Sequence, residues 1–267
     1  MEWNEPLYEV GAGDNSRVGV LVIHGFGGSP CSLQELAGRA VDAGYTVALP
    51  LLTGHGQSPE AMEKSRWADW TADVDKAFAW LKERTDQVFV VGLSMGGTLA
   101  LWTVERHPEV AGLVSVNAML RHPQEFAMRL LGWLGAPRWV KAVGNDVKCP
   151  GVDERAYAKL PSRSTRQLAL LLAEVRRDLS KIACPALLFS SVTDHVVPPK
   201  NQREIFDSLA STDKTFIELR NSYHVATMDY DKEEVFAGTL GFIAQHDARA
   251  TVGEFRTGVF PERNEHA

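Results

Sequence analysis

The sequence predicts an α/β fold in which a mostly parallel, doubly wound sheet carries a small helical insertion. Short β-rich runs alternate with stretches of helical periodicity, as the crossover units of a parallel sheet require. Runs such as Val18–Ile23 are apolar at nearly every position, which indicates strands buried on both faces. The alternation stops between Met119 and Leu179, where helical patterns continue without a convincing strand. This interruption predicts the insertion.

Six segments have the composition of strands, rich in β-branched and aromatic residues. They are Val18–Ile23, Thr46–Leu49, Gln87–Val91, Gly112–Val116, Ala186–Ser191 and Lys214–Arg220. Between the second and third of them, Trp67–Arg84 places apolar residues at intervals of three and four. This spacing predicts an amphipathic helix on the sheet, with Trp67 and Trp70 in the core.

The insertion divides the predicted core into two stretches of sequence. We expect residues 1–118 and 180–246 to form the α/β core, 119–179 the helical insertion, and 247–267 a polar extension of unknown role. Within the insertion, Phe126–Gly135 is unusually apolar, so we expect it either to pack down tightly or to lie over a pocket. Gln167–Leu179 is expected to form a second helix, because two arginines near its end suit a helix C-terminus.

Composition narrows the classes of function. Lys and Arg number 28 against 34 Asp and Glu, a net charge of −6, so a nucleic-acid partner is not expected. No apolar run approaches the roughly 18 residues that a membrane span requires. The acidic N-terminus lacks the basic start of a signal peptide, and Cys31, Cys149 and Cys184 lie far apart, so we expect a cytoplasmic protein with reduced thiols. Because the histidines form no metal-ligand motif, we expect neither a metal nor a cofactor.

The strongest local signal is the sequence GLSMGG at residues 92–97, between an apolar strand and a helical run. A strand that turns sharply into a helix strains the backbone at the serine and leaves no room for side chains two residues away on either side. Glycine occupies both of those positions, Gly92 and Gly96. The segment therefore predicts a nucleophile elbow with Ser94 as the nucleophile.

A serine hydroxyl becomes a good nucleophile only beside a general base that a third group holds in place. Asp194 follows the predicted strand Ala186–Ser191, and His224 follows the strand Lys214–Arg220. Both residues therefore lie where parallel strands end. The order Ser94, Asp194, His224 is the serine, acid, histidine order of this fold class, and we predict that the three form a catalytic triad.

Acyl transfer at a serine also needs two backbone donors for the developing oxyanion. The loop HGFGG at residues 24–28 follows the first strand, and we assign the N–H groups of Phe26 and Met95, the latter favoured by its helix dipole. A dinucleotide-binding loop is rejected because Pro30 occupies the place of the third glycine and no acidic residue follows the second strand. We expect His24 to order this loop rather than to act as the base.

These segments resemble the α/β-hydrolases and, within them, the bacterial monoacylglycerol lipases and related carboxylesterases. The resemblance covers about residues 18–244. It is carried by HGFGG at 24–28, LTGHG at 52–56, GLSMGG at 92–97, DERAY at 153–157, DHVVPP at 194–199 and NSYHVAT at 221–227. It implies an α/β-hydrolase fold whose insertion is a helical cap over an acyl pocket, and a cap carboxylate, Glu154, that contacts the glycerol head of the substrate.

The resemblance and the predicted triad together lead us to expect cleavage of monoacylglycerol to fatty acid and glycerol through an acyl-enzyme on Ser94. A broader carboxylesterase for short or medium acyl esters is the alternative, and a ligand-binding protein that has lost turnover is a third possibility. The expected partner is a small acyl ester or lipid, with transient contact between the cap and lipid aggregates. Without the resemblance, the residues by themselves favour a different interpretation of Glu154, as a solvated helix carboxylate beside Arg155.

Overall fold

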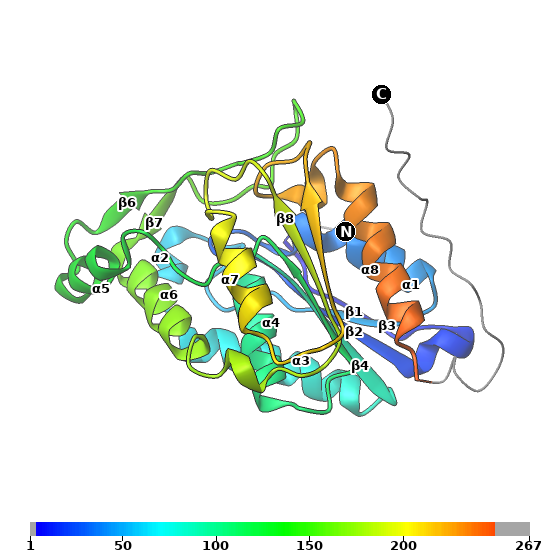
Figure 1. Cartoon of the computed structure of the whole chain (residues 1–267). Helices are drawn as coiled ribbons and strands as arrows, with labels where there is room; N and C mark the ends of the chain where they lie inside the picture. The colour runs from blue at the N-terminus through cyan, green and yellow to red at the C-terminus, as the bar shows by residue number, and fades with distance from the viewer. Residues whose placement is uncertain (1–3, 249–267) are drawn as a thin grey trace, which may run out of the picture.

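A seven-stranded sheet forms the centre of the computed structural model, which describes residues 4–248 (Figure 1). The strand order is β1-β3-β2-β4-β5-β8-β9, and all neighbours are parallel except β1 against β3. The strands are β1 (Leu7–Glu9), β2 (Val18–Ile23), β3 (Thr46–Leu49), β4 (Gln87–Leu93), β5 (Gly112–Val116), β8 (Ala186–Ser191) and β9 (Lys214–Leu219). All six predicted strands are confirmed. The edge strand β1 was not predicted, because three residues are too few to show a period of two.

Helices cover both faces of the sheet, which confirms the doubly wound prediction (Figure 1). On one face lie α1 (Gln34–Asp42) and α8 (Lys232–Gln245). On the other lie α3 (Trp67–Lys82), α4 (Met95–Arg106) and α7 (Lys200–Ser208). Residues of β2 alternate between the two layers, with Val20 and Val22 packing on the α1 and α8 side and Leu21 and Ile23 on the α3 and α4 side. A short helix, α2 (Pro59–Met62), precedes α3.

The insertion between β5 and β8 is not purely helical, so the expectation of no strand between Met119 and Leu179 is wrong. It holds α5 (Glu125–Leu134), β6 (Trp139–Lys141), β7 (Lys159–Pro161) and α6 (Ser162–Val175), and β6 pairs antiparallel with β7. Each of these strands has only three residues, too few for a periodic pattern. Helix α6 also begins and ends earlier than the predicted Gln167–Leu179, because its first turn is polar although Ser162, Ser164 and Thr165 are buried.

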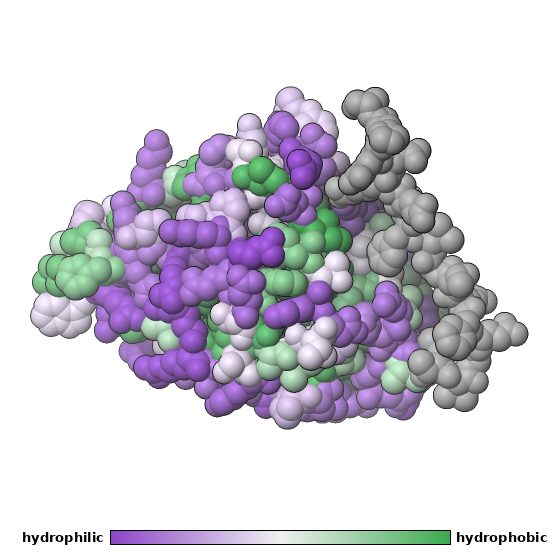
Figure 2. Space-filling view, viewed as in Figure 1, coloured by the Kyte–Doolittle hydropathy of each residue, from purple (hydrophilic) through white to green (hydrophobic). Residues whose placement is uncertain are grey.

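Helix α5 leaves a hydrophobic face in solvent at one end of the molecule. Phe126 is 80% exposed and Trp133 71% exposed, and Leu130 and Leu134 are exposed as well. In Figure 2 hydrophobic surface gathers at the end where Figure 1 places α5. The opposite side of the helix packs on α6, so closely that a Cβ on Gly132 would lie 2.3 Å from the carbonyl oxygen of Ser162.

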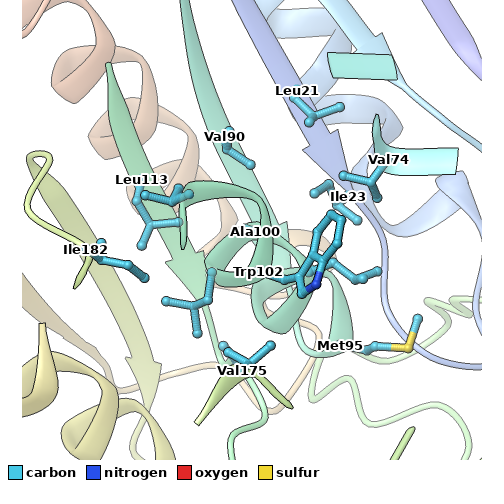
Figure 3. Close-up of a cluster of buried hydrophobic side chains, with 14 of the residues drawn as sticks. Leu21, Ile23, Val74, Val90, Met95, Ala100, Trp102, Leu113, Val175 and Ile182 are labelled. Atoms are coloured by element: carbon cyan, nitrogen blue, oxygen red, sulfur yellow. The ribbon is translucent and has the colours of Figure 1, made fainter. Parts of the chain in front are cut away.

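Figure 3 shows part of the core between the sheet and helices α3 and α4, in which Ile23 of β2, Val74 of α3 and Trp102 of α4 belong to one buried cluster. Trp70 is fully buried there, and Trp67 packs against the same cluster while half-buried. Burial of each such side chain stabilises the fold by about 1.5–3 kcal/mol relative to exposure. The predicted helix and the predicted core position of its tryptophans are confirmed.

The predicted extension 247–267 lies almost entirely outside the described residues. Of its first residues, Asp247 is buried and accepts a hydrogen bond from Nε2 of Gln87 at the start of β4. Among residues 4–248, no helix combines the length and the hydropathy that crossing a membrane demands.

Candidate active site

Ser94 lies between the end of β4 and the start of α4, with φ 58° and ψ −121°. This strained backbone region is rare for a residue with a side chain. The flanking glycines are required by close packing, since a Cβ on Gly92 would lie 2.2 Å from the carbonyl oxygen of Gly96, and one on Gly96 would lie 1.9 Å from that of Ile23. The GLSMGG segment therefore forms the sharp strand-to-helix turn that its sequence predicts.

Asp194 and His224 form a buried pair. Nδ1 of His224 lies 2.8 Å from Oδ2 of Asp194, and the two side chains are 7% and 2% exposed. The other carboxylate oxygen, Oδ1, accepts the N–H groups of Val196 at 2.8 Å and Val197 at 2.7 Å. These bonds fix the orientation of the Asp194 carboxylate. When Nδ1 of His224 carries the proton that it donates to Asp194, Nε2 is left as the basic nitrogen of the ring.

All three predicted triad residues lie at the same edge of the sheet, just after the carboxyl ends of β4, β8 and β9. Asn117, after β5, bridges the loops by donating from Nδ2 to the carbonyl of His224 at 2.8 Å and to Oγ of Ser191 at 2.9 Å. Within the described part of the chain, the Ser94 hydroxyl makes no hydrogen bond. Catalytic hydrogen bonds are often long without substrate and tighten when it binds.

Several carboxylates influence the charge of His224. Burial by itself would lower the pKa of His224, but the carboxylates of Asp194, Glu154 and Asp146 together raise that pKa above its ordinary value of 6.5. The Asp194 hydrogen bond adds to the effect. This environment favours the imidazolium, the form that a general base must reach after it accepts a proton.

The segments that carry the two backbone donors assigned to an oxyanion hole lie next to Ser94. A Cβ on Gly25 would lie 3.4 Å from Cβ of Ser94, so the HGFGG loop passes directly over the serine. Met95 is the first residue of α4, where N–H groups point out of the helix. Among the described residues, neither the Phe26 N–H nor the Met95 N–H donates to a protein acceptor. Both therefore remain available to a bound oxyanion.

His24 orders the loop, as predicted. Its Nε2 accepts the backbone N–H of Leu52 at 3.1 Å, and its Nδ1 lies 3.0 Å from the carbonyl oxygen of Gly25. Burial lowers the pKa of His24 to about 4, so the ring is neutral at physiological pH. These bonds hold the loops after β2 and β3 together.

Glu154 lies in the loop between β6 and β7, so the reading of it as a solvated helix carboxylate is wrong. Its N–H donates to Oδ1 of Asn145 at 2.9 Å, and its half-buried carboxylate accepts no hydrogen bond from the part of the protein that the structure describes. Burial raises the pKa of Glu154 to about 7, and the nearby charge of His224 opposes that rise. The carboxyl group therefore has no hydrogen-bond partner within residues 4–248, and it lies close enough to His224 for their charges to interact.

Asp146 is a site residue that the sequence analysis missed. It is buried in the insertion, and its Oδ2 accepts the N–H groups of His195 at 3.1 Å and His224 at 3.2 Å. Its Oδ1 lies 2.8 Å from Nδ1 of His195. These partners lie 49 and 78 residues further along the chain, so no local motif could have identified Asp146.

Further bonds fasten the insertion around the same edge. Asp229, buried near the His224 loop, accepts the N–H groups of Lys148 and Cys149 from the insertion and that of Tyr223. Tyr157 donates its N–H to the carbonyl of Gly27 at 2.9 Å. The insertion is therefore attached both to the loop that carries His224 and to the loop over Ser94.

Comparisons with known proteins agree with this geometry. A thermostable monoacylglycerol lipase of Bacillus sp. (strain H-257) is 47% identical over 242 residues, which are 91% of this chain and 95% of that protein. A carboxylesterase of Bacillus subtilis (strain 168) is 26% identical over 229 residues, 85% of this chain and 93% of that one. A solved structure from work on LipS and LipT, two metagenome-derived lipolytic enzymes, is 44% identical with a TM-score of 0.87, covering 92% of this chain and 99% of its own.

The family match spans most of the core and all of the insertion. Residues 14–231 match the family described as serine aminopeptidase, S33. The sheet order, the strained serine turn and the neighbours in structure are those of an α/β-hydrolase fold. The chain belongs to the serine aminopeptidase S33 family of α/β-hydrolases.

Proposed function

We propose that this chain is a carboxylic ester hydrolase that cleaves monoacylglycerols to fatty acid and glycerol. The observation that carries the proposal is the buried His224–Asp194 pair, 2.8 Å apart, at the sheet edge that also presents Ser94 on its strained turn. The 47% identity to a monoacylglycerol lipase over nearly the whole of both chains supports the choice of substrate.

In the proposed mechanism, Nε2 of His224 takes the hydroxyl proton of Ser94 as Oγ attacks the ester carbonyl. The N–H groups of Phe26 and Met95 stabilise the oxyanion of the tetrahedral intermediate. The intermediate collapses as His224 returns the proton to the departing glycerol oxygen, leaving an acyl-enzyme. Water then attacks the acyl-enzyme with the same base, and the fatty acid leaves. Asp194 holds the imidazole in the required tautomer throughout.

Glu154 is the proposed contact for the glycerol head. Its carboxyl group has no protein partner among the described residues, and its charge interacts with that of His224. A half-buried polar group without a partner is costly, and the two free hydroxyls of a bound glycerol would supply hydrogen bonds to it.

The insertion is proposed to be a cap that also contacts lipid aggregates. Its attachments at Asp146, Asp229 and Tyr157 support a position over the site. The exposed hydrophobic face of α5 is the feature of this cap that suits transient contact with lipid (Figure 2). Isolated exposed apolar residues are ordinary, but several large ones on one helix mark an interaction surface.

A broader carboxylesterase is the second candidate, favoured by the 26% identity to a carboxylesterase over 229 residues. The two candidates share Ser94, Asp194 and His224 and differ in whether glycerol is recognised. Rates on a monoacylglycerol and on the methyl ester of the same acid separate them, since only the first offers free hydroxyls to Glu154.

The catalytic proposal is tested by labelling the protein with a fluorophosphonate and by a hydrolysis panel of mono-, di- and triacylglycerols. The label should attach to Ser94, and the panel should favour monoacylglycerols. Ser94→Ala should abolish labelling, retain the wild-type melting temperature, and lower kcat by about a million-fold. Residual activity above a few percent of wild type would remove Ser94 from its proposed role.

A further inference from the structure

A basic groove opens beside the exposed face of α5. It has a volume of about 610 Å³ and lies between the segment before α3, the end of α5 and the start of α6. Its charged lining comprises Glu63, Lys64, Arg66, Arg138, Arg163 and Arg166. Five of these six side chains are cationic, so the groove attracts anions.

Glu63, the acidic side chain of the groove lining, already pairs with a cationic side chain. Glu63 accepts hydrogen bonds from Arg138, at 2.7 Å from Nη2 and 3.1 Å from Nε. The other four cations form no salt bridge with any residue in the described part of the chain. They are Lys64, Arg66, Arg163 and Arg166. Among the residues that the structure describes, these four positive charges are therefore not paired in any salt bridge.

The charge of the insertion contrasts with that of the rest of the chain. Residues 119–179 contain eleven Lys and Arg against six Asp and Glu, a net charge of +5, whereas the whole chain is −6. The remaining residues consequently carry a net charge of −11. An anionic surface would attract the insertion and repel the rest of the chain. The protein would therefore approach such a surface with its insertion first.

The groove is continuous with the hydrophobic face of α5. Trp133 lines the groove and is also 71% exposed, and Phe126, Leu130 and Leu134 extend the apolar surface along the same helix. Exposed aromatic and aliphatic side chains next to unpaired Lys and Arg are the combination by which helices lie in an anionic membrane interface. A site built only for a small soluble anion would not need the exposed apolar face.

We propose that this groove binds the phosphate headgroups of an anionic lipid surface while α5 inserts its hydrophobic face between the lipids. The inference rests on the proposed function in one respect, since such a surface is where an acylglycerol substrate would be met. Binding would hold the insertion, which is the proposed cap over Ser94, against the lipid.

The test compares sedimentation of the full-length protein with vesicles of phosphatidylcholine alone and with vesicles that also contain phosphatidylglycerol. We expect clear preference for the anionic vesicles, reduced by added salt. Arg163→Gln/Arg166→Gln should weaken this binding about tenfold or more, because each basic residue near an anionic surface contributes roughly fivefold. The matched control is Lys76→Gln/Lys82→Gln on α3, which removes the same charge far from the groove and should leave binding unchanged. Lys64→Gln/Arg66→Gln tests the groove independently should the first variant be unstable.

Three results would overturn the proposal. The first is equal binding of the wild-type protein to both kinds of vesicle. The second is an equal loss of vesicle binding in the groove variant and in the control variant. If inorganic phosphate raised the melting temperature of wild type but not of the groove variant, while vesicle charge had no effect, the groove would bind free phosphate instead. Turnover of a soluble short-chain ester, measured on the same variants, reports on the catalytic proposal alone, because that substrate needs no surface.

Discussion

Glu154 and Asp146 both come from the insertion, yet both act on the charge of His224. Their carboxylates contribute with Asp194 to the raised pKa of that histidine. They differ in their bonds, because Asp146 accepts backbone N–H groups whereas the Glu154 carboxylate accepts none from the described protein. This difference predicts a role in substrate recognition for Glu154 and a positioning role for Asp146.

For Glu154, the predicted effect depends on the substrate. At a pH above the raised pKa of Glu154, where the carboxyl group is ionised, Glu154→Ala should lower kcat/KM on monoacylglycerols about ten- to hundred-fold, because a hydrogen bond to a charged group contributes about 1.5–3 kcal/mol. The methyl ester of the same acid should be hardly affected. Steady-state kinetics on both substrates check this, with Asp153→Ala as the neighbouring exposed control. Parallel losses on the two substrates would exclude the glycerol contact and favour the plain carboxylesterase.

For Asp146, the prediction concerns pH. His224 must be neutral to accept a proton, so kcat/KM should fall as pH drops through the raised pKa of His224. Asp146→Asn removes a negative charge that stabilises the imidazolium but keeps an acceptor oxygen for the backbone N–H groups. The pKa of His224 should therefore fall, and the acid limb should move to lower pH. Profiles of kcat/KM against pH measure the shift, with the exposed Asp207→Asn as control. If the acid limb of the profile did not move in Asp146→Asn, Asp146 would have only a structural role.

Among the elements, α5 is unusual because only one side of it is packed. Gly132 allows the close approach to α6, and Phe126, Trp133 and their neighbours remain in solvent. A helix held in this way keeps its hydrophobic face available without unfolding.

Phe126→Ser/Trp133→Ser should weaken action on aggregated monoacylglycerol and spare a monomeric short-chain ester. Burial of each large apolar side chain in lipid contributes up to about 1.5–3 kcal/mol, so the loss with aggregates should reach at least tenfold. Rates below and above the aggregation threshold of one substrate measure the effect. Val10→Ser/Tyr230→Ser, which alters hydrophobic residues exposed elsewhere, should behave like wild type. A loss that is equal for monomers and aggregates would argue against lipid contact through α5.

The stability of the whole molecule should depend on Glu105, near the end of α4. In the portion of the chain that the structure describes, its buried carboxyl oxygens have no hydrogen-bond partner. Burial raises the pKa of Glu105 to about 8, although Arg106 opposes the rise. In the unfolded chain, a glutamate ordinarily has a pKa of about 4.3. The folded protein therefore retains a proton that the unfolded chain has released, and folding stability should fall as pH rises between these values.

Glu105→Gln should remove this dependence. At about pH 4.3, the variant and wild type should have similar free energies of unfolding. As the pH rises toward about 8, the variant should become progressively more stable than wild type, because its amide cannot ionise. Melting temperatures across the range measure the difference, with Glu109→Gln as an exposed control. A constant difference at all pH values would show that Glu105 is not protonated in the folded protein.

The central sheet and the serine turn could be predicted from the amino-acid sequence, because both depend on neighbours in the chain. Strands such as β2 are recognisable from continuous apolar residues, and Ser94 from the glycines that its sharp turn requires. The positions of Asp194 and His224 after their strands followed from the rule that parallel strands end at one edge. Short elements such as β1, β6 and β7 could not be recognised, because three residues hold too little periodicity.

The surroundings of these residues could be known only from the folded chain. Three features join segments that lie far apart in the chain. They are the bonds of Asp146 to His195 and His224, the burial of Glu154, and the convergence of basic side chains beside α5. Burial and charge interactions depend on distance in space, which the spacing of residues in sequence does not specify. For that reason the sequence could identify Ser94, Asp194 and His224 as a set, whereas the carboxylates that act on His224 and the groove beside α5 emerged only from the folded arrangement.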